Sequence, residues 1–333
     1  MGQRASHLVV AAVAMMAAMG LPDLASAETS ALTPLRVNVF PGVNNLALYA
    51  AQAKGFFARR GLDVRIQFTP NSEAQREGLA GGAFEIAHAA VDNAIAVAEL
   101  AKVDVIIVMG GDSGMNSLFV QPEIHSYADL RGKTVIVDAP NTAYALLLYK
   151  MLGLNGLDRG VYTVKPVGGT KLRLEAMLKD KSHAATMLNP PFSVLAEHGG
   201  LRNMGLAVRM LGAYQGSGMF VLRAWARANP DTLVRYIQAY VEGLRWAMVP
   251  AHKAEAVALV ADQLKLSADV AAKCYEMAAD PLGGFAKDAR FDIEGFKNTL
   301  RLRAEIENQW GGSPPPAEKY FDLSFYDRAV AGL

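Results

Sequence analysis

The 333-residue chain carries 33 lysines and arginines against 32 aspartates and glutamates, a net charge of +1. This near balance argues against a nucleic-acid partner, which would leave a basic excess. The only cysteine, Cys274, cannot form an internal disulfide, and its small and apolar neighbours in sequence favour a structural thiol over a catalytic one.

The first 27 residues have the pattern of a secretory signal peptide. Arg4 stands near the front, an apolar run covers 8–19, and Ala25-Ser26-Ala27 supplies an Ala-x-Ala cleavage site. The run is well short of the roughly 20 residues of a membrane span, which argues against an N-terminal anchor helix. We therefore expect cleavage after Ala27 and a free periplasmic protein. The remaining chain of about 300 residues is long enough for two lobes.

Residues 35–68 predict one complete strand-helix-strand unit. The strand at 35–40 alternates in polarity and stops at Pro41-Gly42, and a polar loop follows it. Apolar residues at helical spacing then lead to Gly55, a residue type that commonly follows a helix C-terminus. A second strand is predicted at 63–68. A right-handed crossover places these two strands side by side in a parallel sheet.

The alternation of strands and helices continues along the chain, and from Pro230 onward it is mostly helical. Further strands are predicted at 84–88, 103–109, 117–120, 130–138, 162–166, 184–188, 206–211 and 219–223. This order predicts an α/β protein.

The predicted strands form two groups, which indicates a bilobal protein with two parallel or mixed sheets. We expect a first lobe of residues 35–121 and 218–333 and a second lobe of residues 122–217. Two segments cross between the lobes, near 117–121 and 218–222, and we expect the lobes to close on a ligand about them. A single large sheet is the alternative, because periodicity does not reveal strand order.

Four stretches carry a family resemblance: K-G-F-F at 54–57, R-R-G-L-D-V at 59–64, GLAGGAFEIAHAA at 78–90 and LRGKTVIV at 130–137. They resemble periplasmic substrate-binding proteins of the sulfonate, nitrate and taurine (NitT/TauT) family, which also contains binders of thiamine-pyrimidine precursors. The resemblance implies the bilobal type II periplasmic-binding-protein fold. It also implies a monomeric receptor without a cofactor that delivers a small molecule to an ABC permease and its ATPase.

Polar and aromatic residues that follow the predicted strands are the candidate ligand-binding residues, because ligands of open α/β sheets bind outside the carboxyl ends of the strands. The first-lobe candidates are Phe40, Asn44, Asn45, His88 and Ser113, and the second-lobe candidates are Asn141, Thr142, Asn189 and Tyr214. The alternative roles are helix capping for the first-lobe asparagines, a hydrogen-bonded core position for His88, and turn formation for the second-lobe residues. Asp92 is expected to cap a helix.

Several catalytic and metal-binding patterns are excluded. Gly111-Asp112-Ser113-Gly114 resembles the nucleophile motif of chymotrypsin-like proteases, but those folds are β-barrels and the strands here alternate with helices. The six histidines lack the spacing of a metal site. The cysteine-rich iron motif of the yeast-type thiamine-pyrimidine synthase, an enzyme of similar fold, is absent from the sequence. We therefore predict no catalytic and no metal-binding residues.

The ligand class is predicted from the charges near the cleft loops. These loops contain few lysines or arginines in sequence, whereas Asp92, Asp112 and Asp138 lie near them, which argues against a polyanion. Helix N-termini can still hold one sulfonate or carboxylate. A singly charged organic anion is the first choice, and a neutral heterocycle of the pyrimidine kind is the alternative. An enzyme or a sensor built on the same cleft is the third.

Overall fold

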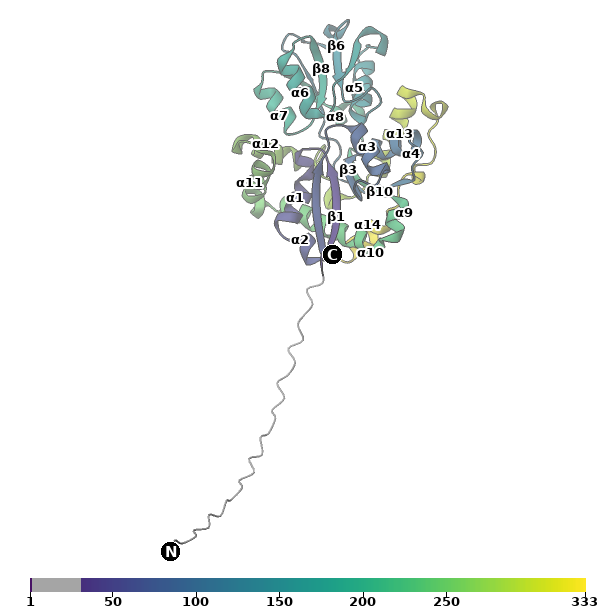
Figure 1. Ribbon diagram of the computed structural model, residues 1–333. Helices are drawn as coiled ribbons and strands as arrows, with labels where there is room; N and C mark the ends of the chain where they lie inside the picture. The colour runs from purple at the N-terminus through teal and green to yellow at the C-terminus, as the bar shows by residue number, and fades with distance from the viewer. Residues whose placement is uncertain (2–30) are drawn as a thin grey trace. The chain divides into compact units, whose positions relative to one another are not determined.

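Two separate five-stranded sheets organise residues 32–333, which form one compact unit (Figure 1). The computed structural model describes Met1 and residues 31–333, so the predicted signal peptide lies outside the described residues. The first sheet has the strand order β2-β1-β3-β10-β4, and the second has the order β7-β6-β8-β5-β9. The predicted bilobal α/β fold is confirmed, and the single-sheet alternative is wrong.

The first sheet is parallel on one side and antiparallel on the other. β1 is parallel to both β2 and β3, whereas β10 is antiparallel to β3 and β4. The strand bounds are Thr33–Val39 for β1, Leu62–Phe68 for β2, Ile86–Ala90 for β3, Val105–Met109 for β4 and Ser217–Leu222 for β10. The edge at β4 is covered by the C-terminal segment, because Ile107 donates its backbone N–H to the carbonyl oxygen of Tyr320 at 2.8 Å.

The second sheet repeats this arrangement. β6 is parallel to β7 and β8, and β5 is antiparallel to β8 and β9. The bounds are Ser117–Val120 for β5, Thr134–Val137 for β6, Thr163–Pro166 for β7, His183–Leu188 for β8 and Arg202–Leu206 for β9. In each sheet the antiparallel inner strand, β10 or β5, is the one that has just arrived from the other lobe.

Two expected elements differ in the structure. The strand 117–120, which the sequence analysis placed at the end of the first lobe, lies inside the second sheet as β5. The chain therefore crosses just before it, at 110–116. The predicted strand at 206–211 is mostly the short helix α8 (Ala207–Leu211). Short apolar runs fit a strand and a helix equally well, and the pairing partner decides between them.

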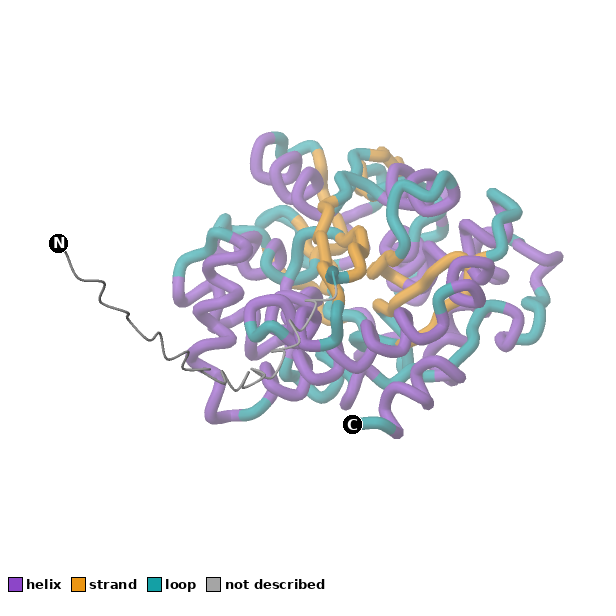
Figure 2. Tube along the Cα trace, turned by 60° about the horizontal axis from the view of Figure 1, so that its bottom comes forward, coloured by secondary structure: helices purple, strands orange, loops and turns teal. Residues whose placement is uncertain are grey.

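Helices cover the sheets from outside, with the strands in the interior (Figure 2). The first-lobe helices are α1 (Leu46–Ala53), α2 (Phe56–Arg59), α3 (Ser72–Ala80), α4 (Val91–Leu100), α9 (Arg223–Ala228), α10 (Pro230–Met248) and α14 (Ser324–Ala331). The second lobe has α5 (Ala143–Leu154), α6 (Thr170–Lys179), α7 (Phe192–His198) and α8. Helix α10 packs closely on α1, because Gly243 has no side chain to clash with the backbone of Ala47 and Ala51.

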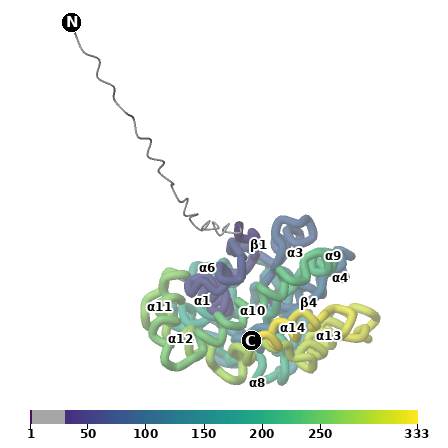
Figure 3. Tube along the Cα trace, turned by 90° about the horizontal axis from the view of Figure 1, so that it is seen from below, coloured from purple at the N-terminus to yellow at the C-terminus, as the bar shows by residue number. Residues whose placement is uncertain are grey.

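The remaining helices lie on opposite sides of α10. Helices α11 (Lys253–Leu264) and α12 (Ala268–Ala278) lie on the side away from α13 (Ile293–Glu307), as Figure 3 shows. Helix α13 touches both lobes. Phe296 and Leu300 belong to a first-lobe core cluster, whereas Leu302 belongs to the core of the second lobe. Helix α13 is therefore a third connection between the lobes, besides the two crossing segments.

Candidate functional site

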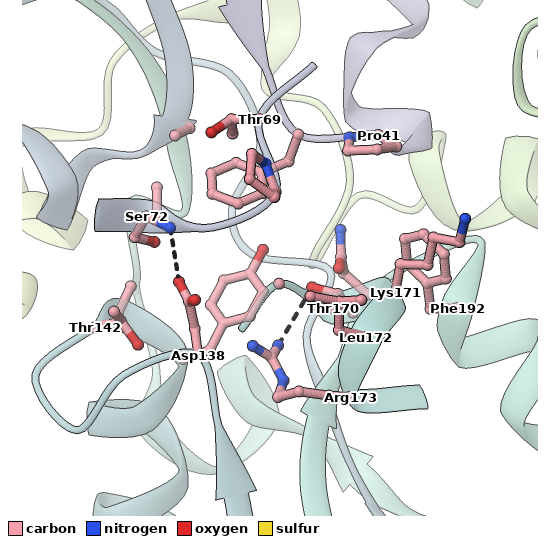
Figure 4. A pocket seen from close by; sticks show the side chains of 18 of the residues that line it. Pro41, Thr69, Ser72, Asp138, Thr142, Thr170, Lys171, Leu172, Arg173 and Phe192 are labelled. Carbon is pink, nitrogen blue, oxygen red and sulfur yellow. Dashed lines mark hydrogen bonds between the residues drawn. The ribbon is translucent and has the colours of Figure 1, made fainter. Parts of the chain in front are cut away.

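A cavity of about 200 Å³ lies where the carboxyl ends of the parallel strands of both sheets face each other. Its wall comes from the loops and helix starts that follow β1, β2 and β3 of the first sheet and β6, β7 and β8 of the second. The lining residues are Phe40, Pro41, Asn44, Thr69, Pro70, Ser72, Ala89, Ala90, Asn93, Asp138, Thr142, Ala143, Tyr144, Gly169, Thr170, Lys171, Leu172, Arg173, Asn189 and Phe192. Figure 4 shows this cavity.

Hydrogen bonds between the lobes close the cavity around its rim. The backbone N–H of Ser72 donates to Asp138 Oδ2 at 3.1 Å, the bond drawn in Figure 4. The N–H of Gly169 donates to the carbonyl oxygen of Pro70 at 3.2 Å, and that of Val43 donates to Pro190 at 3.4 Å. Each bond joins a loop of the first lobe to a loop of the second, so the structure corresponds to a closed cleft.

Four of the predicted site residues line this cavity: Phe40, Asn44, Thr142 and Asn189. Asn44 and Asn189 reach it from opposite lobes, and both side-chain Oδ1 atoms are buried without a hydrogen-bond partner. A buried carboxamide oxygen without a partner costs free energy, so these two groups are available to a bound molecule.

The other predicted residues lie outside the lining. Asn45 is buried and donates through Nδ2 to the carbonyl oxygen of Phe40 at 2.6 Å, which fixes the loop after β1. Asn141 accepts a hydrogen bond at its backbone oxygen from Arg303. Ser113 donates its backbone N–H to Gly284 at 3.1 Å, in the first crossing segment, and Tyr214 is a buried residue of the second-lobe core.

His88 is not among the residues that line the cavity. Its Nε2 is 2.9 Å from the hydroxyl of Tyr236, and its ring stacks on Tyr240 with the centroids 5.0 Å apart. Burial lowers the pKa of His88 to about 3, so the ring is neutral near neutral pH. This geometry is the hydrogen-bonded core arrangement that the sequence analysis gave as the alternative.

The structure adds two cations that the sequence reasoning missed, Lys171 and Arg173 in the first turns of α6. Arg173 is only 1% exposed. Its guanidinium donates to the carbonyl oxygens of Gly168 and Met187 at 2.9 and 3.0 Å and to Thr170 Oγ1 at 3.2 Å. Its Nε is buried without a partner. Burial lowers the pKa of Arg173, and the charge of Asp138 acts in the opposite direction.

The position of Arg173 in the sequence predicts that its side chain reaches the cleft. Helical side chains point back toward the helix N-terminus, so a residue one turn into a helix reaches the loop that precedes it. Arg173 lies three residues after Thr170, the first residue of α6, and Figure 4 draws its guanidinium against Thr170. Few cations were expected near the cleft because only residues beside the strand ends were considered, and Arg173 was therefore missed.

A family model described as "NMT1/THI5 like" matches residues 43–254. The chain belongs to this family. The match confirms the resemblance carried by the stretches at 54–57, 59–64, 78–90 and 130–137. No curated protein sequence matches the chain.

Several solved structures of low sequence identity share the fold of this chain. A protein of Bordetella bronchiseptica RB50 has a TM-score of 0.78 at 19% identity, over 90% of this chain and 98% of that one. The periplasmic nitrate-binding protein NrtA of Synechocystis PCC 6803 has a TM-score of 0.75 at 13% sequence identity, and the match covers 91% of this chain and 89% of that one. The alkanesulfonate-binding protein SsuA of Xanthomonas axonopodis pv. citri, bound to MOPS, has a TM-score of 0.70 at 17% sequence identity, and the match covers 86% of this chain and 96% of that one. These likenesses establish the fold.

Two further findings concern the described part of the chain. Each helix there is too short or too polar to cross a membrane. Residues 31–333 also contain no group of three or more histidine, cysteine, aspartate or glutamate side chains placed to hold a metal ion.

Proposed function

We propose that this protein is a periplasmic receptor that binds a small organic anion, of the sulfonate or carboxylate kind, and delivers it to an ABC importer. One observation carries the proposal: loops from both lobes meet around a cavity at the carboxyl ends of their strands and hydrogen-bond to each other across it. Membership of the NMT1/THI5-like family supports it. So does the shared fold with nitrate- and alkanesulfonate-binding proteins.

Lobe closure is the proposed signal to the importer. The bonds from Ser72 to Asp138 and from Gly169 to Pro70 exist only when the lobes meet, so a ligand that fills the cavity favours the closed state. Each hydrogen bond contributes roughly 1 kcal/mol, and an even equilibrium needs only a few kcal/mol to become mostly closed. The segments 110–116 and 212–216 are the proposed hinges, and α13 has to slide or rotate with them.

The proposed partners are a membrane permease and its cytoplasmic ATPase, and the proposed location follows from cleavage of the signal peptide after Ala27. In this role the bound compound leaves the protein unchanged. Mass spectrometry of the compound before and after incubation with the purified mature protein separates a receptor from an enzyme. Recovery of the intact compound supports the receptor, and a chemically altered compound contradicts it.

A neutral heterocycle of the pyrimidine kind is the second candidate ligand. The observation that favours it is the pair of carboxamides of Asn44 and Asn189, which line the cavity from opposite lobes and whose Oδ1 atoms lack a partner, since an amide can both donate and accept. A thermal-shift screen of alkyl and aryl sulfonates, carboxylates and pyrimidines distinguishes the two classes. Stabilisation by amino acids or sugars alone would contradict both.

Small-angle X-ray scattering tests the receptor mechanism. The protein is first freed of any co-purified compound by partial unfolding and dialysis, and the open state is verified from its larger radius of gyration. Saturation with the best compound of the screen should then reduce the radius of gyration. A protein that starts open and keeps an unchanged radius at saturation would refute the mechanism.

A further inference from the structure

Arg173 differs from the other fully buried arginine in how its charge is balanced. Arg303 is also 1% exposed, and it forms a bidentate ion pair with Asp92, with nitrogen–oxygen distances of 2.7 and 2.8 Å. Arg173 forms no ion pair within the described residues 31–333. Its hydrogen bonds are to carbonyl and hydroxyl oxygens, and its guanidinium lies 5.8 Å from the centroid of the Tyr144 ring. A buried charge normally has a counter-charge, because the loss of hydration is otherwise not offset. Asp138 in the same cavity partly offsets the charge of Arg173 but forms no ion pair with it.

The start of α6 adds a second feature favourable to an anion at the same place. The helix has ten residues, and no side chain caps its N-terminus. Residues 169–173 all line the cavity. The first N–H groups of a helix have no partner within it, and the helix end carries about half a positive charge. The Nε of Arg173, in the same turn of α6, is also without a partner, so this turn offers both backbone and side-chain donors at the cavity wall.

We propose that the first turn of α6 and the Nε–H of Arg173 bind the ligand's anionic group, and that Asp138 restricts the ligand to a single negative charge. The inference rests on the proposed function only in taking this cavity as the ligand site. Asp138 supports the charge limit because it lines the same cavity from the loop after β6, and one of its oxygens is already held by Ser72. A second negative charge on the ligand would face the Asp138 carboxylate in a site shielded from water.

Isothermal titration of the purified mature protein with two probes that share a butyl chain and a tetrahedral anionic head group tests the proposal. Butanesulfonate carries one negative charge, whereas butyl phosphate carries mostly two at about pH 8, since the second pKa of a phosphate monoester is about 6. We expect butanesulfonate to bind at least about tenfold more tightly. Absence of butanesulfonate binding, or equal affinities for the two probes, would overturn the proposal.

Three variants test which residues cause the preference for butanesulfonate. Arg173→Gln should weaken butanesulfonate by about tenfold or more, because a charge-assisted hydrogen bond is lost. Asp138→Asn keeps an oxygen for the Ser72 N–H and should bring the two affinities within about threefold of each other. Lys179→Gln is the matched control: this cation lies at the other end of α6, is exposed and does not line the cavity, so butanesulfonate affinity should change by less than about threefold.

Circular dichroism and thermal unfolding verify that each variant folds. If Arg173→Gln does not fold, Arg173→Lys takes its place, because it keeps the charge and loses the Nε–H; it should weaken butanesulfonate by about tenfold. Wild-type affinity in the folded Arg173 variant would overturn the proposal. The proposed function fails separately: a protein that closes on an intact compound of another class, yet ignores butanesulfonate, refutes this inference and leaves the receptor function standing.

Discussion

The two buried arginines of the cleft region, Arg303 and Arg173, have equal exposure and opposite surroundings. Arg303 is held by the Asp92 carboxylate at 2.7 and 2.8 Å, by the backbone oxygen of Asn141 at 2.9 Å and by Gln309 Oε1 at 3.0 Å. Arg173 is held by neutral oxygens and keeps one N–H unused. The protein pairs the first charge directly, whereas the second has the Asp138 carboxylate in the same cavity without an ion pair and, in our proposal, gains the anionic group of the ligand.

The comparison distinguishes a buried charge that stabilises the fold from a buried charge that, in our proposal, binds the ligand. Arg303 pairs with Asp92 of α4 in the first lobe and donates to the backbone oxygen of Asn141 in the loop after β6 of the second, so it joins the two lobes in the closed arrangement. Removal of one partner from such a pair leaves an uncompensated buried charge. Removal of Arg173 leaves no such charge. The two arginines should therefore respond differently to mutation.

The largest expected effect is on stability, from Asp92→Ala. It leaves the Arg303 charge buried and unpaired and should lower the free energy of unfolding by about 3 to 5 kcal/mol. Urea unfolding followed by circular dichroism measures it. Asp288→Asn is the control, because it breaks the partly exposed pair with Arg245 and should cost at most about 1 kcal/mol. Similar losses in the two variants would contradict the assigned role of Arg303.

Arg173→Gln should cost less stability than Asp92→Ala in the ligand-free protein. The variant loses hydrogen bonds to Gly168 and Met187 but also removes a buried charge, so we expect a loss of about 2 kcal/mol. The same urea titration measures it. A loss as large as that of Asp92→Ala would mean that Arg173 is chiefly a structural residue.

His88 is a third basic group to compare with the two arginines, because it is buried in its neutral form. Its folded-state pKa of about 3 lies below the ordinary value of 6.5, so the unfolded chain binds the extra proton first as the pH falls. The stability contribution is complete above about pH 6.5 and is lost as the pH falls toward 3. Between about pH 7 and about pH 5.5 the loss should be about 1 kcal/mol.

His88→Gln should flatten this pH dependence. Urea midpoints of wild type and variant at the two pH values measure the difference, and His198→Gln, at an exposed position, should leave the wild-type slope unchanged. An unaltered slope in His88→Gln would show that His88 does not cause the acid sensitivity.

The smallest expected effect comes from an exposed pair across the lobes. Lys150 of α5 donates to Glu305 of α13 at 2.6 Å, but the side chains are 28% and 57% exposed. Glu305→Gln should therefore lower the free energy of unfolding by only about 0.5 kcal/mol, and less at high salt. A loss above about 2 kcal/mol would show that the ionic links of α13 matter as much as its buried pair.

Sequence reasoning succeeded where local pattern decides the structure. The strand ends, and with them Phe40, Asn44, Thr142 and Asn189 in the cavity wall, follow from alternation and turn residues. It failed where distant segments meet. Asp92 was expected to cap α4, yet its partner Arg303 lies 211 residues further along the chain. The place of β5 in the second sheet likewise depends on pairing with β8, which periodicity does not encode.

The central claim is that Arg173, and not Arg303, is the counter-ion of the ligand. Nitrogen–proton correlation spectra of the arginine Nε–H groups test it directly, with the two signals assigned from Arg173→Lys and Arg303→Lys. On titration with butanesulfonate, the Arg173 signal should shift and its exchange with water should slow as Nε–H gains an acceptor, while the Arg303 signal stays in place. An Arg173 signal that remains unmoved at saturation, or that moves no more than the Arg303 signal, would contradict the claim.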